Sequence, residues 1–391
     1  MITPNLYPHV YTLFFTVMFS FGLSACSGGG GSSTNNDIDD DGIINANDID
    51  ADGDGLIELH SLEHLDWMRN DLSGQSLTDF MGNADTNGCP SPAGCHGYEL
   101  MANLDFDTDN NGRLDSNDTY HDYDKDGQNN GWLPIGDATV PFQASFEGND
   151  FHIRNLRINR LGIDLETGGS NIGLFGVISA INSAIDISNI HLGGPLTEVR
   201  GREYVGGLIG YSKPSGQAIT IQNCDVTGTI SATEIYVGGL IGSLNFDADV
   251  SVLNSHAMGS VSGVLRTGGL IGQVNRFGNS TLLLDANYTN VLVYGSSSYT
   301  GGLIGDFTSL GVGFATIVNN YVLGTVSGRN YTGGFIGHLL VGGKMSVYSS
   351  FVTNSYVNGG VFTGGFVGTA STNLDGEIYI FDNFMTTTRV Q

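Results

Sequence analysis

The sequence is poor in positive charge. Only 14 of its 391 residues are Lys or Arg, against 40 Asp or Glu, so the formal net charge is −26. Such a surface repels nucleic acid and anionic lipid headgroups, and it attracts divalent cations. We therefore expect no nucleic-acid partner, and we expect metal sites among the acidic residues.

Proline and long apolar runs are also scarce. There are 8 Pro residues, and the 59 Gly residues follow no Gly-X-Y triplet, which excludes a collagen. The apolar run at residues 13–23 is too short to span a bilayer and is typical of a signal-peptide core. Leu23-Ser24-Ala25-Cys26 follows it and resembles a bacterial lipobox. The resemblance implies a signal peptide at 1–26, a lipid on Cys26 and sorting to the outer membrane; an ordinary secretory signal is the alternative.

Only four cysteines are present, which limits disulfide bonding. Cys89 and Cys95 flank a short turn-rich loop, and in an exported protein we predict a disulfide between them. Cys224 occupies a repeat position that carries Ser or Asn elsewhere. We expect it to be a small buried residue.

The acidic residues concentrate at the front of the chain, with about 23 of the 40 between Asp37 and Asp126. Two twelve-residue loops there repeat oxygen-bearing side chains at positions 1, 3, 5, 9 and 12, with Gly at position 6 and an aliphatic residue at position 8. Calcium prefers such wrapped oxygen ligands. The first loop is predicted to use Asp37, Asp39, Asp41, Ile43, Asn45 and Asp48. The second is predicted to use Asp107, Asp109, Asn111, Arg113, Asp115 and Asp118.

Asp at position 12 makes these loops resemble dockerin-type and thrombospondin type 3 calcium repeats. Two partial loops give weaker candidates, namely Asp50, Asp52, Asp54 and Glu58, and Asp122, Asp124 and Asp126. A solvated acidic linker is the alternative. Calcium is the expected cofactor, and its expected role is to rigidify this segment.

A helix is predicted from Ser61 to Leu72, with Ser61 as its cap and an apolar stripe at Leu62, Leu65, Met68 and Leu72. It is a candidate N-terminal cap for the repeats. His60, Glu63 and His64 match the H-x-x-E-H pattern of inverted zinc peptidases. Because no third ligand is evident, we favour solvated histidines over a zinc site.

Seven glycine signatures organise the rest of the chain. The strongest reads Val205-Gly206-Gly207-Leu208-Ile209-Gly210, and the closing glycines recur every 30 to 34 residues from Gly176 to Gly368. The segments between them are short, alternating and β-branched, which favours strands over helices. We therefore predict an all-β fold: a parallel β-helix with two or three strands in each repeat of about 32 residues.

Two columns recur along the predicted coils. Asn223, Asn254 and Asn319 share a turn position, where they either stack their amides or tolerate a left-handed backbone. An aromatic column precedes the glycine pair and is a candidate ligand face for sugars, although a packing ladder is the alternative. Its members are Tyr204, Tyr236, Tyr299, Tyr331 and Phe362, with Arg266 between them.

The repeats, together with Trp132-Leu-Pro-Ile-Gly136 and the segment from Phe142 to Leu156, resemble bacterial surface proteins that bear the GLUG motif. The resemblance spans nearly the whole mature chain. It implies an exported, adhesin-like protein. Some large relatives cleave immunoglobulin A, but their catalysis resides in a separate domain that this sequence does not carry.

The expected organisation is a signal peptide (1–26), a tether (27–36), an acidic calcium and cap segment (37–131) and a β-helix (132–391). We expect a lipid-anchored protein at the bacterial cell envelope that binds glycans, matrix or cell-surface proteins without catalysis. The alternatives are a polysaccharide-processing β-helix enzyme, or a structural envelope protein. A lyase needs a cationic base, and the repeats are poor in cations; Arg200, Arg202 and Arg266 would support a lyase if they met acids in a groove.

Overall fold

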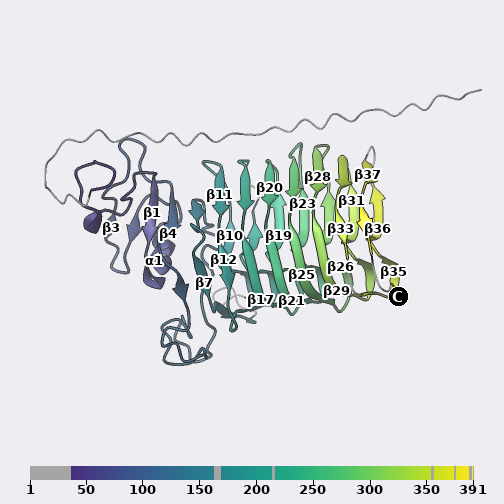
Figure 1. The fold of residues 1–391 in the computed structure, drawn as a ribbon, viewed down its shortest axis with the longest axis horizontal. Coiled ribbons are helices and arrows are strands. Elements are labelled where there is room, and N and C mark those ends of the chain that lie inside the picture. Colours follow the sequence, from purple (N-terminus) through teal and green to yellow (C-terminus); the bar gives the residue numbers. More distant parts are fainter. Residues whose placement is uncertain are drawn as a thin grey trace, which may run out of the picture. The chain divides into compact units, whose positions relative to one another are not determined.

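The computed structural model describes residues 37–162, 169–213, 216–353, 356–373, 376–386 and 390. The predicted signal peptide, Cys26 and the tether lie outside these residues. Residues 37–391 cluster as one compact unit. Four parallel sheets run along this unit and build a β-solenoid of about seven turns, as the 32-residue period predicted (Figure 1).

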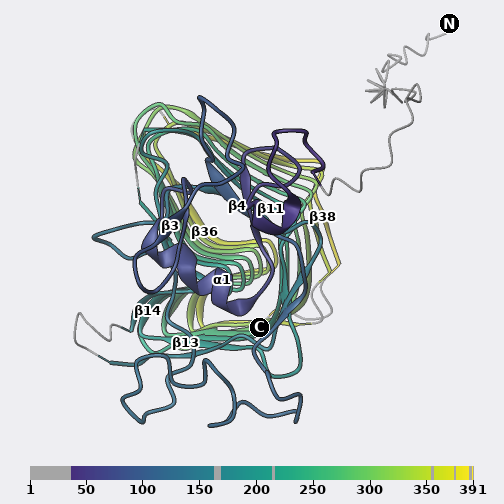
Figure 2. The same ribbon diagram turned by 90° about the vertical axis from the view of Figure 1, so that its left-hand side faces the viewer.

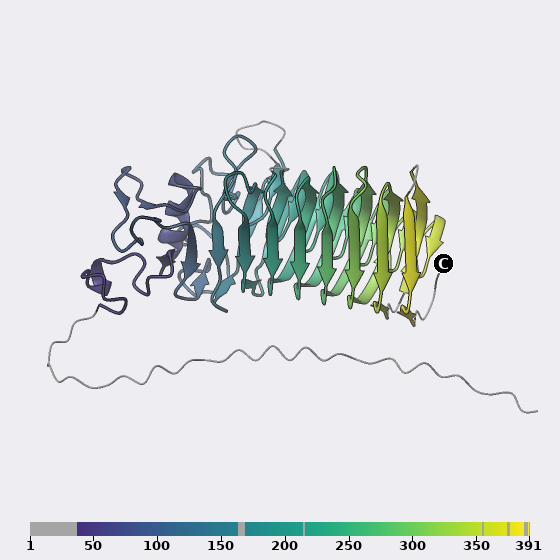
Figure 3. The same ribbon diagram turned by 90° about the horizontal axis from the view of Figure 1, so that it is seen from above.

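The ten-stranded sheet begins in the acidic segment. Its strands, in order, are β1 (Leu56–Leu59), β4 (Gly97–Leu100), β6 (Ser145–Glu147), β11 (Ile185–Ser188), β16 (Ile219–Gln222), β20 (Val250–Leu253), β24 (Leu282–Asp285), β28 (Phe314–Val318), β32 (Lys344–Tyr348) and β37 (Glu377–Phe381). Figure 3 shows these strands side by side and pointing the same way. Since β1 and β4 precede residue 132, the sheets extend into the predicted calcium and cap segment.

A twelve-stranded sheet forms a second face. It contains β5 (Leu104–Asp105), β7 (His152–Arg154), β12 (His191–Gly193), β17 (Asp225–Ala232), β21 (His256–Gly263), β25 (Tyr288–Gly295), β29 (Tyr321–Ser327), β33 (Phe351–Val352) and β38 (Phe384–Met385), with β8 (Arg157–Asn159), β13 (Glu198–Gly201) and β34 (Tyr356–Asn358) beside them.

Two seven-stranded sheets complete each coil. One contains β9 (Ser170–Ile172), β14 (Glu203–Gly206), β18 (Ile235–Gly238), β22 (Leu265–Gly268), β26 (Ser298–Gly301), β30 (Asn330–Gly333) and β35 (Val361–Gly364). The other contains β10 (Phe175–Ile178), β15 (Ile209–Ser212), β19 (Ile241–Phe246), β23 (Ile271–Arg276), β27 (Ile304–Ser309), β31 (Ile336–Val341) and β36 (Val367–Thr372). A coil therefore has four strands, not the two or three predicted, because the glycine signature bends the chain between two short strands.

The glycine pair permits a tight corner. An ideal Cβ on Gly268 would lie 1.9 Å from the backbone oxygen of Ile271, and one on Gly269 would lie 2.0 Å from that of Gly302 in the next coil. Real side chains do not tolerate such distances. The repeated glycines therefore set how closely the backbone turns and how closely coils stack.

The interior is a set of aligned apolar columns. In the ten-stranded sheet, Ile187, Ile221, Val252, Leu284, Ile317 and Val347 are in register on consecutive strands. All of them are fully buried. Alternation along each strand sends every second side chain inward, so one sequence period supplies one layer of core.

A polar ladder also runs through the interior. Asn287 and Asn320 are fully buried, and Nδ2 of Asn287 donates to Oδ1 of Asn320 at 3.0 Å. Free Cys224 occupies the same column and is buried, as predicted; burial raises the pKa of its thiol to about 12. These hydrogen bonds link one coil to the next where the chain turns.

The asparagine column named from the sequence lies one residue earlier, on the exposed side of the turn. Asn223, Asn254 and Asn319 all have positive φ. Nδ2 of Asn254 donates to Oδ1 of Asn223 at 2.8 Å, while Asn319 bonds to Asp285 instead. Both sequence interpretations therefore hold at Asn223 and Asn254, where the amides stack and the backbone is left-handed.

The predicted cap helix is present but short. The α-helix α1 (Leu62–Trp67) continues into the 3-10 helix η2 (Met68–Asn70), and Ser61 caps α1 by accepting a hydrogen bond from the backbone N–H of His64 at 3.1 Å. Leu65 and Met68 are fully buried in the core. Figure 2 looks at the first coils from this end and shows α1 crossing in front of the interior. Smaller elements are η1 (Asn45–Asn47) and the antiparallel pair β2 (Leu77–Thr78) and β3 (Ala84–Asp85).

Cys89 and Cys95 form the predicted disulfide. It closes the loop just before β4, beside the partial acidic loop of Asp50, Asp52 and Asp54, where the sulfur of Cys95 lies 3.7 Å from Oδ2 of Asp50. Among the residues that the structure describes, no helix has the length and apolar character needed to span a membrane.

Candidate functional site

Four acidic loops each gather three carboxylates. In every group the ligand atoms lie within 4.8 Å of one another. The groups are Asp37, Asp39 and Asp41; Asp50, Asp52 and Asp54; Asp107, Asp109 and Asp118; and Asp122, Asp124 and Asp126. Both full loops and both partial loops therefore bring together most of the acids that the sequence nominated.

The four loops share one local geometry. In each, the first aspartate accepts a hydrogen bond from the backbone N–H of the glycine five residues later. The donors are Gly42 to Asp37 at 3.1 Å, Gly55 to Asp50 at 3.0 Å, Gly112 to Asp107 at 2.9 Å and Gly127 to Asp122 at 2.9 Å. All four glycines have positive φ, which allows the chain to wrap back around the carboxylates.

Several oxygens in these loops are buried without a hydrogen bond from the described residues. In the first loop these are Oδ1 of Asp37 and Oδ1 of Asn45, at ligand positions 1 and 9. In the loop of Asp122, Asp124 and Asp126, Oδ1 of Asp122 is likewise buried without a hydrogen bond from the described residues. Buried polar atoms normally have partners, and a hard cation would supply one here. The donor set therefore fits calcium.

The two full loops differ at position 12. Asp118 is only 2% exposed and joins the group of Asp107 and Asp109, as predicted. Asp48 does not belong to the first group; its Oδ1 accepts from the N–H of Asp50 at 2.9 Å. The Asp48 carboxylate packs directly against Gly88. A Cβ atom placed on Gly88 would lie 1.6 Å from Oδ1 of Asp48, so this position has no room for a side chain.

The partial loops also have particular partners. Glu58 lies on β1, apart from the Asp50 group, with its Oε2 3.0 Å from Nε2 of His60. Asp124 accepts from Nη1 of buried Arg160 at 3.0 Å. Burial works to raise the pKa of Asp124, but the hydrogen bond and charge of Arg160 outweigh burial, so this pKa is lowered. Asp124 is thus neutralised in part by the protein itself.

A cavity of about 680 Å³ lies between α1 and the Asp107–Asp118 loop. Three partly buried aromatic rings line it, those of Trp67, Tyr120 and Tyr123, together with Phe80, whose side chain is 74% exposed. Polar groups share the lining: Glu63, Asp66, Asn70, Thr108 and Thr119. Aromatic surface with a few convergent polar groups is typical of small-ligand and sugar sites.

The charge in the cavity is small. Asp66 pairs with Arg69 at 2.6 Å, and Arg69 also lies over the rings of Tyr123 and Trp132. Glu63, on the first turn of α1, is exposed. The lining therefore carries one uncompensated carboxylate beside aromatic surface, an amide and the hydroxyls of Ser61, Thr108 and Thr119, which suits a neutral polyhydroxylated ligand.

The cavity wall is tied to the Asp107–Asp118 loop. The N–H and the hydroxyl of Thr108 both donate to Oδ1 of Asp118, at 2.7 and 3.1 Å. The N–H of Thr119 in turn donates to the Thr108 hydroxyl at 3.3 Å. Whatever fixes Asp118 also fixes Thr108, Thr119 and the adjoining Tyr120.

Of the H-x-x-E-H residues, Glu63 lines this cavity, and the rings of His60 and His64 lie 6.0 Å apart, centroid to centroid, but among the described residues the three do not gather as a metal group. His60 precedes α1 and its ring contacts Glu58, while the ring of His64 stacks on Trp67 with centroids 5.3 Å apart. Burial lowers the pKa of His64. His64 therefore supports the aromatic lining.

The aromatic column forms a continuous stack. The rings of Tyr204 and Tyr236 are 4.6 Å apart and nearly parallel, and those of Tyr331 and Phe362 are 5.1 Å apart. The Arg266 guanidinium lies between Tyr236 and Tyr299, at 5.1 and 5.4 Å. Every member has positive φ. Because neighbours cover the ring faces within the column, a sugar cannot stack on them there, and the geometry favours the packing ladder.

Arg266 does meet an acid. Its Nε donates to Oδ2 of Asp306 at 2.7 Å, and Nδ1 of His338 lies 2.7 Å from Oδ1. Asp306 is 2% exposed, and Gln273 donates to it at 3.2 Å. Arg202 pairs with Glu203 at 2.8 Å and Arg200 lies 3.9 Å from Glu198. With Arg266 held by two rings and a buried carboxylate, the arrangement is that of a structural ion pair.

The cavity was not predicted from the sequence. Trp67 is one position before the apolar stripe residue Met68. Tyr120 comes two residues after Asp118, and Tyr123 lies between Asp122 and Asp124 of the next acidic loop. Aromatic residues beside the acidic loops were the available signal. What brings them together is the packing of α1 on the Asp107–Asp118 loop, which lies 40 or more residues away along the chain.

Comparison with known proteins gives limited matches. No protein-family model matches the chain, so the GLUG resemblance remains a prediction from its motifs. The chain is 31% identical over 212 residues to Halomucin from Haloquadratum walsbyi; the match covers 51% of this chain and only 2% of that protein. The fold is similar to the crystal structure of a putative immunoglobulin A1 protease from Bacteroides ovatus, with a TM-score of 0.48, 16% identity and 86% of each chain covered.

Proposed function

We propose that this protein is a calcium-stabilised, non-catalytic glycan-binding protein of the bacterial cell envelope. The observation that carries the proposal is the cavity between α1 and the Asp107–Asp118 loop, with aromatic rings on its walls and few charges. Neutral glycans are the ligand class, because the net charge of −26 disfavours polyanions.

Calcium has a structural part in this proposal. Bound at Asp107, Asp109 and Asp118, it would supply positive charge that holds the three carboxylates together. Asp118 would then hold Thr108, and through it Thr119, at the cavity wall. Glycan affinity is therefore expected to fall in chelator and to return with added calcium.

The test uses affinity electrophoresis through gels that contain neutral polysaccharides, with calcium present. Phe80→Ala should weaken binding about fivefold or more, since one aromatic contact contributes on the order of 1 kcal/mol beyond its area. Glu63→Gln should weaken it also. Phe314→Ala is the matched control, because Phe314 is likewise exposed, at 58%, but lies on β28. Unchanged binding in Phe80→Ala and Glu63→Gln would remove the cavity from the proposal.

Envelope anchoring forms the second part of the proposal and rests on Cys26 alone. Cells grown with a labelled fatty acid should label the protein, and Cys26→Ser should abolish the label. A labelled Cys26→Ser protein would disprove the anchor without touching the glycan site.

Polysaccharide processing is the second candidate, favoured by one contact, Arg266 to Asp306. It requires Arg266 to leave the two rings that cover it. Shortening of a polymer by the wild-type protein, and its loss in Arg266→Lys, would support this candidate over binding alone.

A further inference from the structure

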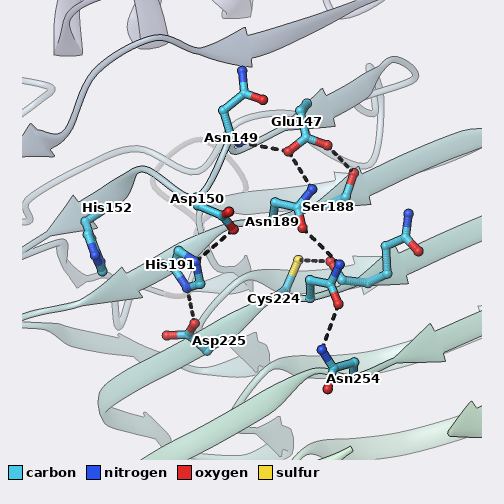
Figure 4. Close-up of polar contacts among 12 residues, drawn as sticks. Glu147, Asn149, Asp150, His152, Ser188, Asn189, His191, Cys224, Asp225 and Asn254 are labelled. Carbon is cyan, nitrogen blue, oxygen red and sulfur yellow. Dashed lines mark hydrogen bonds and ion pairs between the residues drawn. The ribbon is translucent and has the colours of Figure 1, made fainter. Parts of the chain in front are cut away.

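Four side chains form a second cluster on the outer face of the twelve-stranded sheet (Figure 4). His152, His191 and Asp225 are direct partners in register on β7, β12 and β17. Asp150 lies two residues before His152, at the end of a turn in which Asn149 and Asp150 both have positive φ. That turn brings the Asp150 carboxylate back toward His191.

His191 is bound on both sides of its ring. Its Nδ1 contacts Oδ1 of Asp225, and its Nε2 lies 3.4 Å from Oδ1 of Asp150. The Asp225 contact fixes the ring orientation and, in the neutral imidazole, places the hydrogen on Nδ1. The Nε2 lone pair then points toward Asp150. This is the arrangement in which proteins prepare a histidine for metal binding.

The distance from Nε2 to Asp150 bears on two interpretations. A charged N–H···O⁻ hydrogen bond is shorter, about 2.7 to 2.9 Å. Two ligands on one tetrahedral zinc, each about 2.0 to 2.2 Å from the metal, are roughly 3.4 Å apart. The observed 3.4 Å is that of a long hydrogen bond and also leaves the room that two zinc ligands need.

His152 provides a third donor. Its side chain is exposed, and its ring lies 5.2 Å from the His191 ring, centroid to centroid. Among the described residues its ring has no hydrogen-bond partner. His152 does not lie within ligand distance of both His191 and Asp150 as it stands, so its side chain must rotate out of the ring contact with His191 to bring a nitrogen to the metal. The carboxylate of Asp150 is 82% exposed, which leaves an open path for the ion.

We propose that His191, Asp150 and His152 bind a divalent transition metal of the zinc class, and that Asp225 positions His191 from behind. Water completes the tetrahedral shell. This site is independent of the glycan cavity and differs from the aspartate loops in its donors. Imidazole nitrogen favours zinc-class ions, whereas the loops offer only the oxygen ligands that calcium prefers.

The experiment measures zinc bound by the full chain through competition with a chromogenic chelator, in a large excess of calcium so that the aspartate loops are filled. We expect one zinc per chain. His191→Ala should abolish it, and His152→Ala should weaken it at least tenfold. Asp225→Asn should weaken it about 10- to 100-fold, the usual effect of losing a supporting carboxylate. Cobalt in place of zinc should give the visible absorption of a tetrahedral site.

His256→Ala is the matched control, since His256 is the next residue in register after Asp225 and is no ligand in this proposal. It should leave zinc affinity unchanged. Because His152 is exposed, His152→Ala tests the site without endangering the fold. Zinc binding that is equal in wild type, His152→Ala and His191→Ala would overturn the proposal. A complete absence of zinc binding in the presence of calcium would also overturn the proposal. His191 would then be a protonated bridge between Asp150 and Asp225.

Discussion

The buried ion pair at Asp306 gives a quantitative test of how the coils are held together. Four donors converge on its carboxylate: Arg266 and His338 at 2.7 Å, Gln273 at 3.2 Å and the Thr308 hydroxyl at 3.4 Å. Asp306→Asn keeps the size of the side chain but removes its charge and turns an NH2 group toward a donor. Removing one partner of a buried pair destabilises a protein by about 3 to 5 kcal/mol. Because Arg266 is 24% exposed and can be hydrated, we expect the lower end, about 3 kcal/mol.

The effect should depend on pH in a definite direction. Burial alone would raise the pKa of Asp306, but the hydrogen bonds and charges of His338 and Arg266 outweigh it and lower this pKa. A carboxyl whose folded pKa is depressed stabilises the protein above its unfolded pKa, about 4, and loses that contribution as pH falls through the folded value. The difference between wild type and Asp306→Asn should therefore be large at pH 7 and shrink below about pH 4.

Equilibrium urea unfolding, followed by circular dichroism, measures both quantities. Exposed Asp382 provides the control, and Asp382→Asn should change the unfolding free energy by less than about 0.5 kcal/mol. A loss below about 1 kcal/mol in Asp306→Asn, or a loss that grows as pH falls, would refute the view that a charged Asp306 holds Arg266 and His338.

Three further predictions concern other parts of the molecule. Chelating calcium should lower the melting temperature, since each site loaded at about 100 times its Kd adds roughly 2.7 kcal/mol to the unfolding free energy. Asp118→Asn should make the shift in melting temperature smaller, and calorimetry with and without chelator checks both expectations. Gly269→Ala should destabilise by about 3 kcal/mol or more, because its Cβ would lie 2.0 Å from the Gly302 oxygen, and urea unfolding of this variant would show it. Buried Cys224 should resist thiol reagents until the protein unfolds, because burial raises its pKa to about 12; labelling followed by mass spectrometry would detect early reaction.

Local rules explain what the sequence could predict. The glycine period predicted the solenoid because each corner admits no side chain, as at Gly269. Ser61 predicted the start of α1 because its hydroxyl can reach the N–H three residues on. The aspartate spacing predicted the group of Asp107, Asp109 and Asp118, since one loop contains all three.

The features that the sequence could not predict depend on strand register and on the packing of adjacent coils. The interior polar ladder runs through Asn287 and Asn320, one residue after the column chosen from the sequence, because a left-handed turn residue points its neighbour inward. His191 meets Asp150 and Asp225 across 41 and 34 residues, separations that acquire meaning only once adjacent coils are aligned. The stacking of Tyr204 on Tyr236, which covers their faces, likewise depends on how the rings tilt.

The central claim is that the protein binds neutral glycans without cleaving them, and that calcium supports the binding. The most direct test incubates it with a panel of neutral and acidic polysaccharides, in calcium and in chelator, and follows polymer mass and co-elution by size-exclusion chromatography with light scattering. The account predicts that a neutral polymer keeps its mass and co-elutes with the protein in calcium, and that co-elution falls in chelator. Shortening of any polymer, or no co-elution with any neutral polymer, would contradict it.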